Sequence, residues 1–533
     1  MYKKIMLNQC GYYPSMPKHA TFVSEQPVTF EVRTSDGTGV LRKTTTKAFD
    51  NKAAGERNYI GDFSELTEPG IYYLFAEGLG ESDIFPIGET VYDSVLQKTF
   101  AFFYYQRCGH TLPKEAAGIF AHEACHTGIA TAYTKNDERD VTGGWHDAGD
   151  YGRYVGPGAM AVAQLLYAYE INPDFVNQYV SPEDALNQTK LPACLEEIKY
   201  ELDWMLKMQR ADGPLYHKAS CKNFCGFIMP DKELEPMVLS PVSVTATADF
   251  AAVCAMAIRF YKPYDEAYAR VLETASKKAY DAMKKMDLPG GFKNPPEITT
   301  GEYGDTCDID ERYYAAAELY KAFGDEIYRQ DFEAIAKEKI YHGYGWGEMG
   351  SFGNVAYLTC GRPVDEAIAE KIKASMIKLA DKRLEIISND GYGTALKASE
   401  YVWGSNLSVC NYANQLYDAY RLTNDDKYLH GAMEQLHYLL GRNPMGQSYV
   451  SDCGTTTMRY PHHRPSGYLG KALPGMVSGG PCDWLADETA KSVLTKDTPP
   501  AKCFVDMTGS YSTNEVTIYW NSPFIQLMAA ITK

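Results

Sequence analysis

The chain has 533 residues and a net charge of −17, and 45% of its residues are apolar. This length and composition predict a globular protein with more than one domain and exclude a disordered chain. The acidic excess argues against nucleic acid or an anionic membrane as a partner, because their phosphates would repel the chain. The sequence contains no uninterrupted apolar run of about 18 residues that would predict a membrane span.

The cysteines and the first residues bear on the compartment in which the protein works. Thirteen cysteines, an odd number, are scattered through the chain, which is typical of reduced thiols rather than of a disulfide framework. The opening stretch MYKKIMLNQCGYYP contains no apolar segment of signal-peptide length. We therefore expect a cytoplasmic protein, or a secreted one if a leader has been removed.

Residues 1–86 are expected to form a small β-sandwich of immunoglobulin type. Short runs of β-branched and aromatic residues, such as VTFEVRT and GIYYLFAE, alternate with turn sequences such as SDGTG and TEPG. Several short strands at close intervals are typical of this fold. The segment DIFPIGET would lead into a second domain, residues 87–533.

The second domain is expected to be mainly α. Apolar residues recur at helical spacing in eleven segments, and more weakly at residues 350–359. Long loops rich in Gly and Pro separate these segments and carry most of the unusual polar residues, which indicates a site built from loops. Helices arranged in pairs would fit an α/α toroid. The eleven segments are 91–108, 158–171, 194–209, 245–261, 264–285, 309–324, 326–340, 364–383, 406–423, 425–441 and 521–533.

The loop GGWHDAGDYG places two carboxylates, Asp147 and Asp150, three residues apart. Its glycines permit tight turns, so both side chains can project from one loop into the same space. Two carboxylates that converge on a water molecule can orient it and accept its proton. The alternative is an ordinary turn in which the aspartates bond backbone N–H groups.

Two loops near the C-terminus carry further polar groups. Glu515, in YSTNEVTIYWNSPF, has apolar and aromatic neighbours, which favour the protonated form of a carboxyl and suit a general acid. Its alternative role is to complement the dipole of the following helix. His462, His463 and Arg464, in MRYPHHRPSGY, are donors suited to sugar hydroxyls or to a metal, or else form a basic patch.

Together these segments resemble glycoside hydrolase family 9, the inverting β-glucanases. The family's GGW.DAGDY segment, its PHHR loop and its C-terminal NEV…WN segment all occur here, in the family's order. IMLNQCGYYP, IGDFS and GIYYL resemble the small immunoglobulin-like domain of one branch of the family. The resemblance covers essentially the whole chain, and it implies an (α/α)6 barrel for the second domain.

The resemblance also implies a role for each carboxylate. Asp150 would be the catalytic base, Asp147 would help to hold the attacking water, and Glu515 would be the general acid. Inversion needs room for that water, so the base and acid carboxyls are expected about 6.5–9.5 Å apart, with no covalent sugar intermediate.

The expected sugar contacts come from the same loops. The resemblance implies that His462 and Arg464, with His463 beside them, donate hydrogen bonds to the sugar. Aromatic stacking is expected from the loops before the last helices, although each of these side chains could instead belong to the core. The candidates are Trp403, Tyr511 and Trp520, with Asn406 as a polar neighbour.

Two metal sites are implied by the resemblance. The first is a structural zinc site, because a set of two cysteines and two histidines suits tetrahedral Zn²⁺ and leaves no open position for a catalytic water. The second is a calcium site in TTGEYGDTCDIDE, where the alternative is that the carboxylates cap the next helix. The zinc ligands would be Cys108, Cys125, His126 and His146, and the calcium ligands Asp310, Glu311 and carbonyls near Thr306.

The expected reaction is hydrolysis of β-1,4-glucosidic bonds, as the resemblance implies. A cytoplasmic enzyme would meet cellodextrins or other soluble β-glucans rather than crystalline cellulose. Three alternatives remain: an exo-β-glucosaminidase acting on chitosan oligosaccharides, a non-catalytic sugar-binding protein of the same fold, and a hydrolase that uses the Cys/His cluster as a catalytic metal site.

Overall fold

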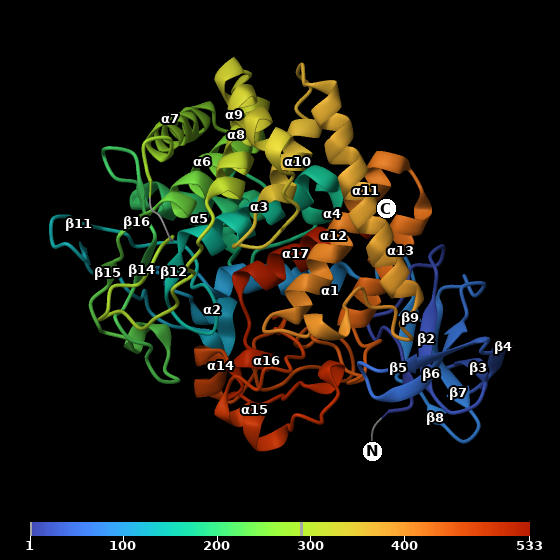
Figure 1. Ribbon diagram of the computed structural model, residues 1–533. Helices are drawn as coiled ribbons and strands as arrows, with labels where there is room; N and C mark the ends of the chain where they lie inside the picture. Colours follow the sequence, from blue (N-terminus) through green and yellow to red (C-terminus); the bar gives the residue numbers. More distant parts are fainter. Residues whose placement is uncertain (1–2, 288–290, 533) are drawn as a thin grey trace. The chain divides into compact units, whose positions relative to one another are not determined.

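The computed structural model describes residues 3–287 and 291–532 (Figure 1). It forms two compact units, one made of Met1–Phe102 with Lys378–Lys533 and the other of Phe103–Ile377. The ends of two predicted segments, residues 1–2 and residue 533, lie outside the described residues. The sequence division at residues 86 and 87 stays a prediction.

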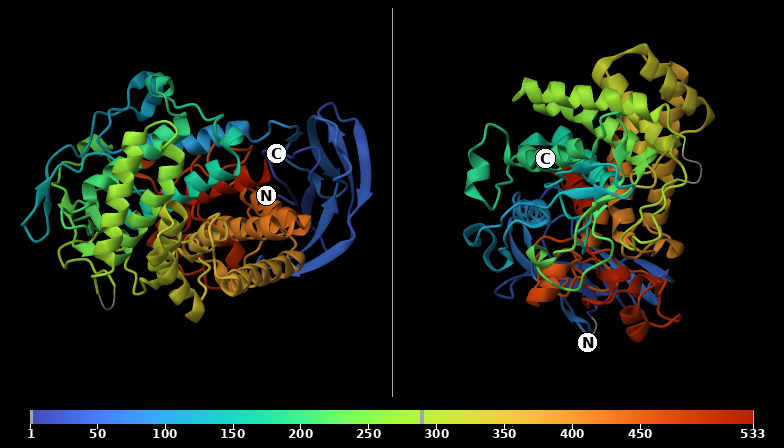
Figure 2. Two further views of the ribbon diagram at one scale, coloured as in Figure 1. Left: turned by 90° about the horizontal axis from the view of Figure 1, so that it is seen from above. Right: turned by 90° about the vertical axis from the view of Figure 1, so that its left-hand side faces the viewer.

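The first unit begins with two antiparallel sheets, which form two layers in Figure 2. One sheet has the order β1-β2-β6-β5, and the other has the order β4-β3-β7-β8 with β9 also paired to β7. Side chains from both sheets share one apolar core. The strands are β1 Ile5–Met6, β2 His19–Val23, β3 Thr29–Thr34, β4 Gly39–Thr44, β5 Lys47–Asn51, β6 Glu56–Asp62, β7 Gly70–Ala76, β8 Gly80–Glu81 and β9 Phe85–Ile87.

Strand β3 shows why this sequence forms a sandwich. Phe30 and Val32 are buried in the core, whereas Glu31 and Arg33, which alternate with them, form an ion pair of 2.6 Å on the other face. Alternation with a period of two buries one face of a strand and exposes the other. The strand predicted from VTFEVRT is confirmed, as is the one predicted from GIYYLFAE.

The sequence did not predict strands β4 and β5. Each lies at the end of its sheet, and all of residues 39–44 are exposed or half-buried. An edge strand with little buried surface needs no apolar alternation, so it leaves no clear signal in the sequence.

The helices of the first unit pack around α17 (Ile518–Ile531). Every residue of α17 is buried, and it contacts α12 (Ser405–Thr423) and α13 (Asp426–Leu439). This burial explains why its sequence is almost uniformly apolar. The shorter helices nearby are α14 Arg464–Leu469, α15 Glu488–Val493 and α16 Tyr511–Asn514, while α1 Asp93–Tyr105 and α11 Glu366–Ser388 run across the division between the units.

Within the first unit, the sandwich is fastened to the helices by buried polar contacts. His19 of β2 donates to the Glu434 carboxylate of α13 at 2.6 Å, and Arg442 pairs with the same carboxylate. The Thr21 hydroxyl accepts from Arg442 Nε at 3.1 Å and donates to the Gly391 carbonyl at 2.7 Å. These contacts join β2 to α13, to the segment that follows α13 and to the loop that follows α11.

The second unit is built on α6 (Val244–Tyr261). Its sequence is long and apolar enough to cross a membrane, but 83% of it is buried inside the protein, as in the core helix of a globular domain. It packs against α3, α7 and α8. The other helices are α2 Lys114–Ala117, α3 Val155–Ile171, α4 Pro173–Val176, α5 Ala193–Met208, α7 Glu266–Met283, α8 Ile309–Phe323, α9 Glu326–Glu338 and α10 Gly350–Leu358.

Each of the eleven predicted helical segments overlaps an α-helix of the structure, and the weak segment at 350–359 is α10. The second unit also has two small sheets that hold the loops before α3 and α6, with the orders β11-β10-β15-β14-β12 and β13-β16. Their strands are β10 Ala130–Ala132, β11 Glu138–Arg139, β12 Arg153–Tyr154, β13 Leu215–Tyr216, β14 Lys218–Ser220, β15 Val238–Leu239 and β16 Val242–Ser243.

Candidate functional site

In the second unit, the GGWHDAGDYG loop turns sharply before β12. Gly144 has φ +75, and a Cβ there would lie 2.7 Å from the Trp204 ring, so the position requires glycine. The Asp147 amide donates to the Gly152 carbonyl at 2.9 Å, and the Gly152 amide donates to Asp150 Oδ2 at 3.0 Å. This backbone brings the two aspartates, both buried, onto one short turn.

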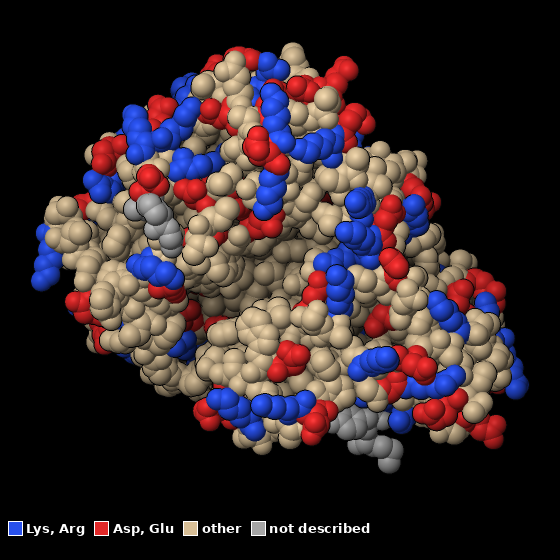
Figure 3. Space-filling model, in the orientation of Figure 1, with Lys and Arg blue, Asp and Glu red and all other residues tan. Residues whose placement is uncertain are grey.

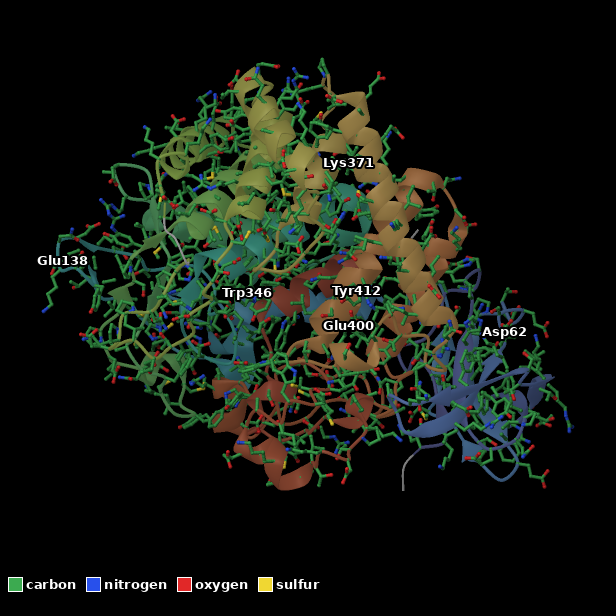
Figure 4. All side chains as sticks on the ribbon, viewed as in Figure 1. Asp62, Glu138, Trp346, Lys371, Glu400 and Tyr412 are labelled. Atoms are coloured by element: carbon green, nitrogen blue, oxygen red, sulfur yellow. The ribbon has the colours of Figure 1, made fainter. Side chains whose placement is uncertain are left out.

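Two tyrosines brace these carboxylates. The Tyr154 hydroxyl donates to Asp150 Oδ2 at 3.2 Å, and the Tyr303 hydroxyl donates to Asp147 Oδ2. The tyrosine rings lie 4.8 Å apart, and Tyr303 meets the Trp346 ring edge-on at 5.0 Å. Figure 4 labels Trp346. Both aspartates are therefore held in defined orientations by groups that can only donate to them.

Lys218 lies behind Tyr154. Its ammonium group donates to the Thr300 carbonyl at 3.2 Å and lies 5.4 Å from the Tyr154 ring centre. Burial lowers the pKa of Lys218 to about 8, while the charges of Asp150 and Glu302 act in the opposite direction. Tyr154 lies two residues after the motif and had no assigned role, and neither Tyr303 nor Lys218 was predicted to lie beside the aspartates, because both come from distant segments.

In the first unit, Glu515 lies beside the PHHR loop. The His462 amide donates to the Asn514 carbonyl at 2.9 Å, and a parallel bridge pairs His462 with Glu515. The Gly479 amide donates to the Glu515 carbonyl at 2.9 Å. His462 also donates from Nδ1 to the Thr508 carbonyl at 2.7 Å, which fixes its ring. The acid and donor predicted from separate motifs are thus adjacent.

A path of rings continues from His462. The ring centres of His462 and Tyr511 lie 5.8 Å apart, and those of Tyr511 and Trp403 lie 5.2 Å apart. Trp403 is 40% exposed. The segment before Trp403 is anchored by Glu400, which accepts from Arg383 at 2.8 Å and from Tyr412 at 3.1 Å. Glu400 and Tyr412 are labelled in Figure 4. Trp403 therefore offers ring surface on a supported loop, and Tyr511, the first residue of α16, packs beside it.

The other two candidates for sugar contact are buried. Asn406 is fully buried and donates to the Ser478 carbonyl at 2.9 Å. Trp520 is 2% exposed, and its ring fills the space beside Gly404 and Gly479. As the structure places them, both support the loops that carry Glu515 and Trp403.

His463 and Arg464 complete the PHHR loop. Both are buried, and His463 Nδ1 is 2.8 Å from the Ser466 hydroxyl. Arg464 is the first residue of α14, whose left-handed end at Gly470 closes the short helix. The loop is therefore folded tightly onto its own helix.

The four predicted zinc ligands of the second unit converge. Cys108 Sγ lies 3.7 Å from His126 Nδ1 and 4.0 Å from Cys125 Sγ, and Cys125 Sγ lies 3.6 Å from His146 Nε2. A tetrahedral Zn²⁺ with such ligands requires separations of about 3.3–3.8 Å between donor atoms. All four donor atoms lie within 4.8 Å of one another, so this set fits a metal.

The cluster is connected to the aspartate loop through the backbone. The Cys108 amide donates to the Gly144 carbonyl at 2.8 Å, and the His146 amide donates to the Gln106 carbonyl at 2.7 Å. Arg107 and Trp145 form an antiparallel bridge between these bonds. An ion held by the cluster would therefore fasten the loop of Asp147 and Asp150 to the end of α1.

The predicted calcium region contains more buried carboxyl groups than its motif showed. Glu311 and Asp249, from α8 and α6, are fully buried, and neither carboxylate has a hydrogen-bond partner among the described residues. Burial and neighbouring carboxyls raise the pKa of both groups. Asp310 accepts from the Met349 amide at 2.9 Å, and burial raises its pKa to about 6, whereas Thr306 is exposed. Such carboxyls require a proton or a cation.

The chain matches two family models. The model described as glycosyl hydrolase family 9 matches residues 92–528, and the model described as the cellulase N-terminal ig-like domain matches residues 1–81. A cellodextrinase of Butyrivibrio fibrisolvens is 38% identical over 99% of this chain and 100% of its own. Endoglucanase D of Acetivibrio thermocellus is 36% identical over 99% of this chain and 83% of its own.

Solved structures give the same result. AaCel9A in complex with cellobiose-like isofagomine matches with a TM-score of 0.95 and 35% identity, over 99% of this chain and 100% of that one. A Zn-binding triple mutant of the family 9 endoglucanase J30 matches with a TM-score of 0.92 and 31% identity, over 98% and 99% of the two chains. The predicted fold class, an (α/α)6 barrel preceded by an immunoglobulin-like sandwich, is confirmed. The chain belongs to glycosyl hydrolase family 9 and is a glycoside hydrolase.

Proposed function

We propose that this enzyme cleaves β-1,4-glucosidic bonds in cellodextrins and other soluble β-glucans with inversion, using Asp150 as base and Glu515 as acid. The observation that carries the proposal is the pair of aspartates held on one turn by Tyr154 and Tyr303. The similarity to a cellodextrinase over the full length of both chains supports the substrate class.

The proposed chemistry is a single displacement. Asp147 and Asp150 orient a water molecule, and Asp150 takes its proton as the water oxygen attacks the anomeric carbon. The bond from that carbon to the leaving oxygen breaks, and Glu515 gives its proton to that oxygen. The tyrosine hydroxyls bonded to the aspartates keep both carboxylates in the positions proposed to hold the water. The anomeric centre is inverted, and no bond forms between sugar and enzyme.

The residues beside Glu515 would hold the sugar. His462 and Arg464, with His463 next to them, are proposed as hydrogen-bond donors to the sugar. Trp403 and Tyr511 are proposed as stacking surfaces, because the Trp403 loop is anchored by Glu400 and the Tyr511 ring of α16 packs beside Trp403. Aromatic side chains commonly line ligand sites, where the apolar face of a sugar ring can stack on them. Buried Trp520 and Asn406 would act by supporting this loop.

We propose that zinc binds the Cys108, Cys125, His126 and His146 cluster. Its donor set and its spacing fit Zn²⁺, and all four positions would be filled by protein, so the ion would stabilise the loop rather than activate water. We further propose calcium at Asp310 and Glu311, with a carbonyl near Thr306 and with Asp249 as an added carboxylate. The unpartnered buried oxygens of Asp249 and Glu311 support a cation there.

A reducing compartment is proposed as the place of action. All thirteen cysteines lie in the described part of the chain, none is joined in a disulfide, and most are buried. On the face drawn in Figure 3, Lys and Arg side chains intermingle with Asp and Glu, which supports a sugar rather than a nucleic acid as the partner. Soluble oligosaccharides would be the available substrates in the cytoplasm.

The test compares hydrolysis of cellopentaose with hydrolysis of chitosan pentaose. The wild type is expected to cleave the cello-oligosaccharide, and Asp150→Asn and Glu515→Gln are expected to lose about 10²–10⁴-fold in kcat. Glu488→Gln, an exposed change on α15, serves as the control and is expected to keep full activity.

Other outcomes would identify the alternatives. Cleavage confined to the chitosan series would show an exo-β-glucosaminidase. Binding of both sugars without any hydrolysis by the wild type would show a sugar-binding protein. Immediate loss of hydrolysis on metal removal, in a chain that stays folded, would show a catalytic metal.

A further inference from the structure

A carboxylate lies directly behind one ligand of the metal cluster. His126 faces Cys108 with Nδ1, and its other ring nitrogen, Nε2, lies 3.0 Å from Glu233 Oε2. The His126 side chain is 1% exposed and that of Glu233 is 7% exposed. Glu233 follows the short 3-10 turn Pro230–Lys232, more than a hundred residues along the chain from His126, so this contact is made by the fold.

The chemistry of a zinc-bound histidine determines which group donates and which accepts in this contact. A neutral imidazole that binds metal through Nδ1 must carry its proton on Nε2. A carboxylate that accepts from Nε2–H fixes this tautomer, orients the ring and makes the ligand more basic. We propose that Glu233 is the positioning residue of His126, which holds its Nδ1 lone pair toward the zinc site.

The same contact links a loop to the metal centre. The Cys221 thiol donates to the Glu235 carbonyl at 3.4 Å, which closes the segment that carries Glu233. The Tyr151 hydroxyl, next to Asp150 in sequence, donates to the Ile228 carbonyl of the same segment. Glu233 therefore joins residues 221–235 to the cluster from one side, while Tyr151 joins them to the aspartate loop.

A second metal ion is the competing explanation. Donor atoms of His126, Cys221 and Glu233 also lie within 4.8 Å of one another. The direct contact of 3.0 Å between Nε2 and the carboxylate favours a hydrogen bond, because neutral histidine has a proton to donate there. One zinc per chain is expected at this centre, with Cys221 outside the coordination sphere.

The experiment measures zinc in the full-length chain. It rests on the proposed zinc site and not on hydrolysis, since affinity is read by competition with a chelator and stoichiometry by elemental analysis. Glu233→Ala is expected to weaken zinc binding about 10–100-fold. The zinc affinity of Glu233→Gln is expected to lie between those of the wild type and Glu233→Ala, because the uncharged amide oxygen can still accept from Nε2–H. Glu235→Ala, an exposed change in the same loop, should leave the affinity unchanged.

Two further readouts separate positioning from a general loss of structure. The melting temperatures of the metal-free Glu233→Gln variant and wild type should agree, while those of the zinc-loaded forms differ. Nitrogen NMR should place the His126 proton on Nε2 in the zinc-loaded wild type. Unchanged affinity in Glu233→Ala would overturn the proposal. So would two zinc ions in the wild type with one lost in Cys221→Ser, and a wild type that binds none would overturn the zinc site as well.

Discussion

Tyr303 is the residue whose effect on the reaction follows most directly from its contacts. Its hydroxyl donates to Asp147, the aspartate proposed to hold the water. A hydrogen bond to a charged group contributes about 1.5–3 kcal/mol. Tyr303→Phe keeps the ring against Tyr154 and Trp346 but removes this bond. We expect kcat to fall about 10–100-fold with KM little changed, in steady-state assays on cellopentaose.

The matched control is Tyr133→Phe, which removes an exposed hydroxyl bonded to Glu297. It should leave kcat unchanged. If Tyr303→Phe were as active as the wild type, Asp147 would need no such support and its proposed role would lose its structural basis.

For single residues, the sequence indicated which side chains are candidates for the site better than it indicated which of them are exposed. The motifs brought out Asp147, Asp150 and Glu515, because each stands in a short local pattern, whereas the widely spaced zinc ligands were implied only by the family resemblance. They could not separate Trp403, which is 40% exposed, from Trp520, which is 2% exposed. Both tryptophans stand in polar loops, and only packing against Gly404 and Gly479 buries the second.

At the scale of elements, α13 carries a pH-sensitive contact with the sandwich. His437 is buried, and its Nδ1 accepts from the Asn8 amide at 3.0 Å. Burial lowers the pKa of His437 from 6.5 to about 3. The charge of Glu434 raises this pKa, and the charge of Arg442 lowers it further. The folded chain therefore keeps this histidine neutral at pH values where the unfolded chain protonates it.

The sign of the pH effect follows from these values. Between pH 6.5 and 3 the unfolded state binds more protons, so the free energy of unfolding falls as the pH is lowered. His437 alone contributes a slope of up to about 1.4 kcal/mol per pH unit. Burial also lowers the pKa of His217 to about 3, so two histidines add to the slope. The free energy of unfolding of His437→Gln, measured with denaturant across this pH range, should lack the part of the slope that His437 contributes.

His430→Gln, an exposed change on the same helix, should keep the slope of the wild type. An identical slope in His437→Gln would mean that this histidine does not differ between the folded and unfolded chains.

Element by element, the sequence predicted long periodic segments and missed short or exposed ones. The segment TATADFAAVCAMAIRFY is α6 because its small and apolar residues pack on several helices at once. The strands β4 and β5 lie at sheet edges, and helices of four to six residues such as α14 and α16 depend on their loops. Such elements have too few residues for a period to show.

At the scale of the molecule, the immunoglobulin-like sandwich is expected to stabilise the enzyme. Within the first unit, Arg442 is fully buried and meets Glu434, which His19 of the sandwich also contacts. Removal of residues 1–86 would expose this pair and the apolar surface around it. The deletion removes the His19 contact to Glu434, and loss of a partner from a buried charged cluster costs about 3–5 kcal/mol, so we expect the melting temperature to fall by about 3–5 °C.

The measurement is differential scanning calorimetry of the full chain and of the chain without residues 1–86, with activity followed in parallel. A shortened chain that proved soluble, equally stable and fully active would show that the sandwich is not a structural support.

The fold of the whole chain could be predicted from its motifs because they span both ends of the sequence. The Ig-like segment, the DAGD loop and the C-terminal NEV segment occur in one order, and the family models match residues 1–81 and 92–528. Residues such as Asp249 and Glu233 could not be predicted, since each meets its partners only through tertiary packing.

The central claim is that Asp150 and Glu515 cleave the β-glucosidic bond by a single displacement. The most direct test is anomer-resolved NMR of the first products of cellopentaose, recorded before mutarotation equilibrates them. The account predicts that the new reducing ends appear first as the α-anomer. Initial release of the β-anomer would show retention through a covalent intermediate and would contradict the assignment of the two carboxylates.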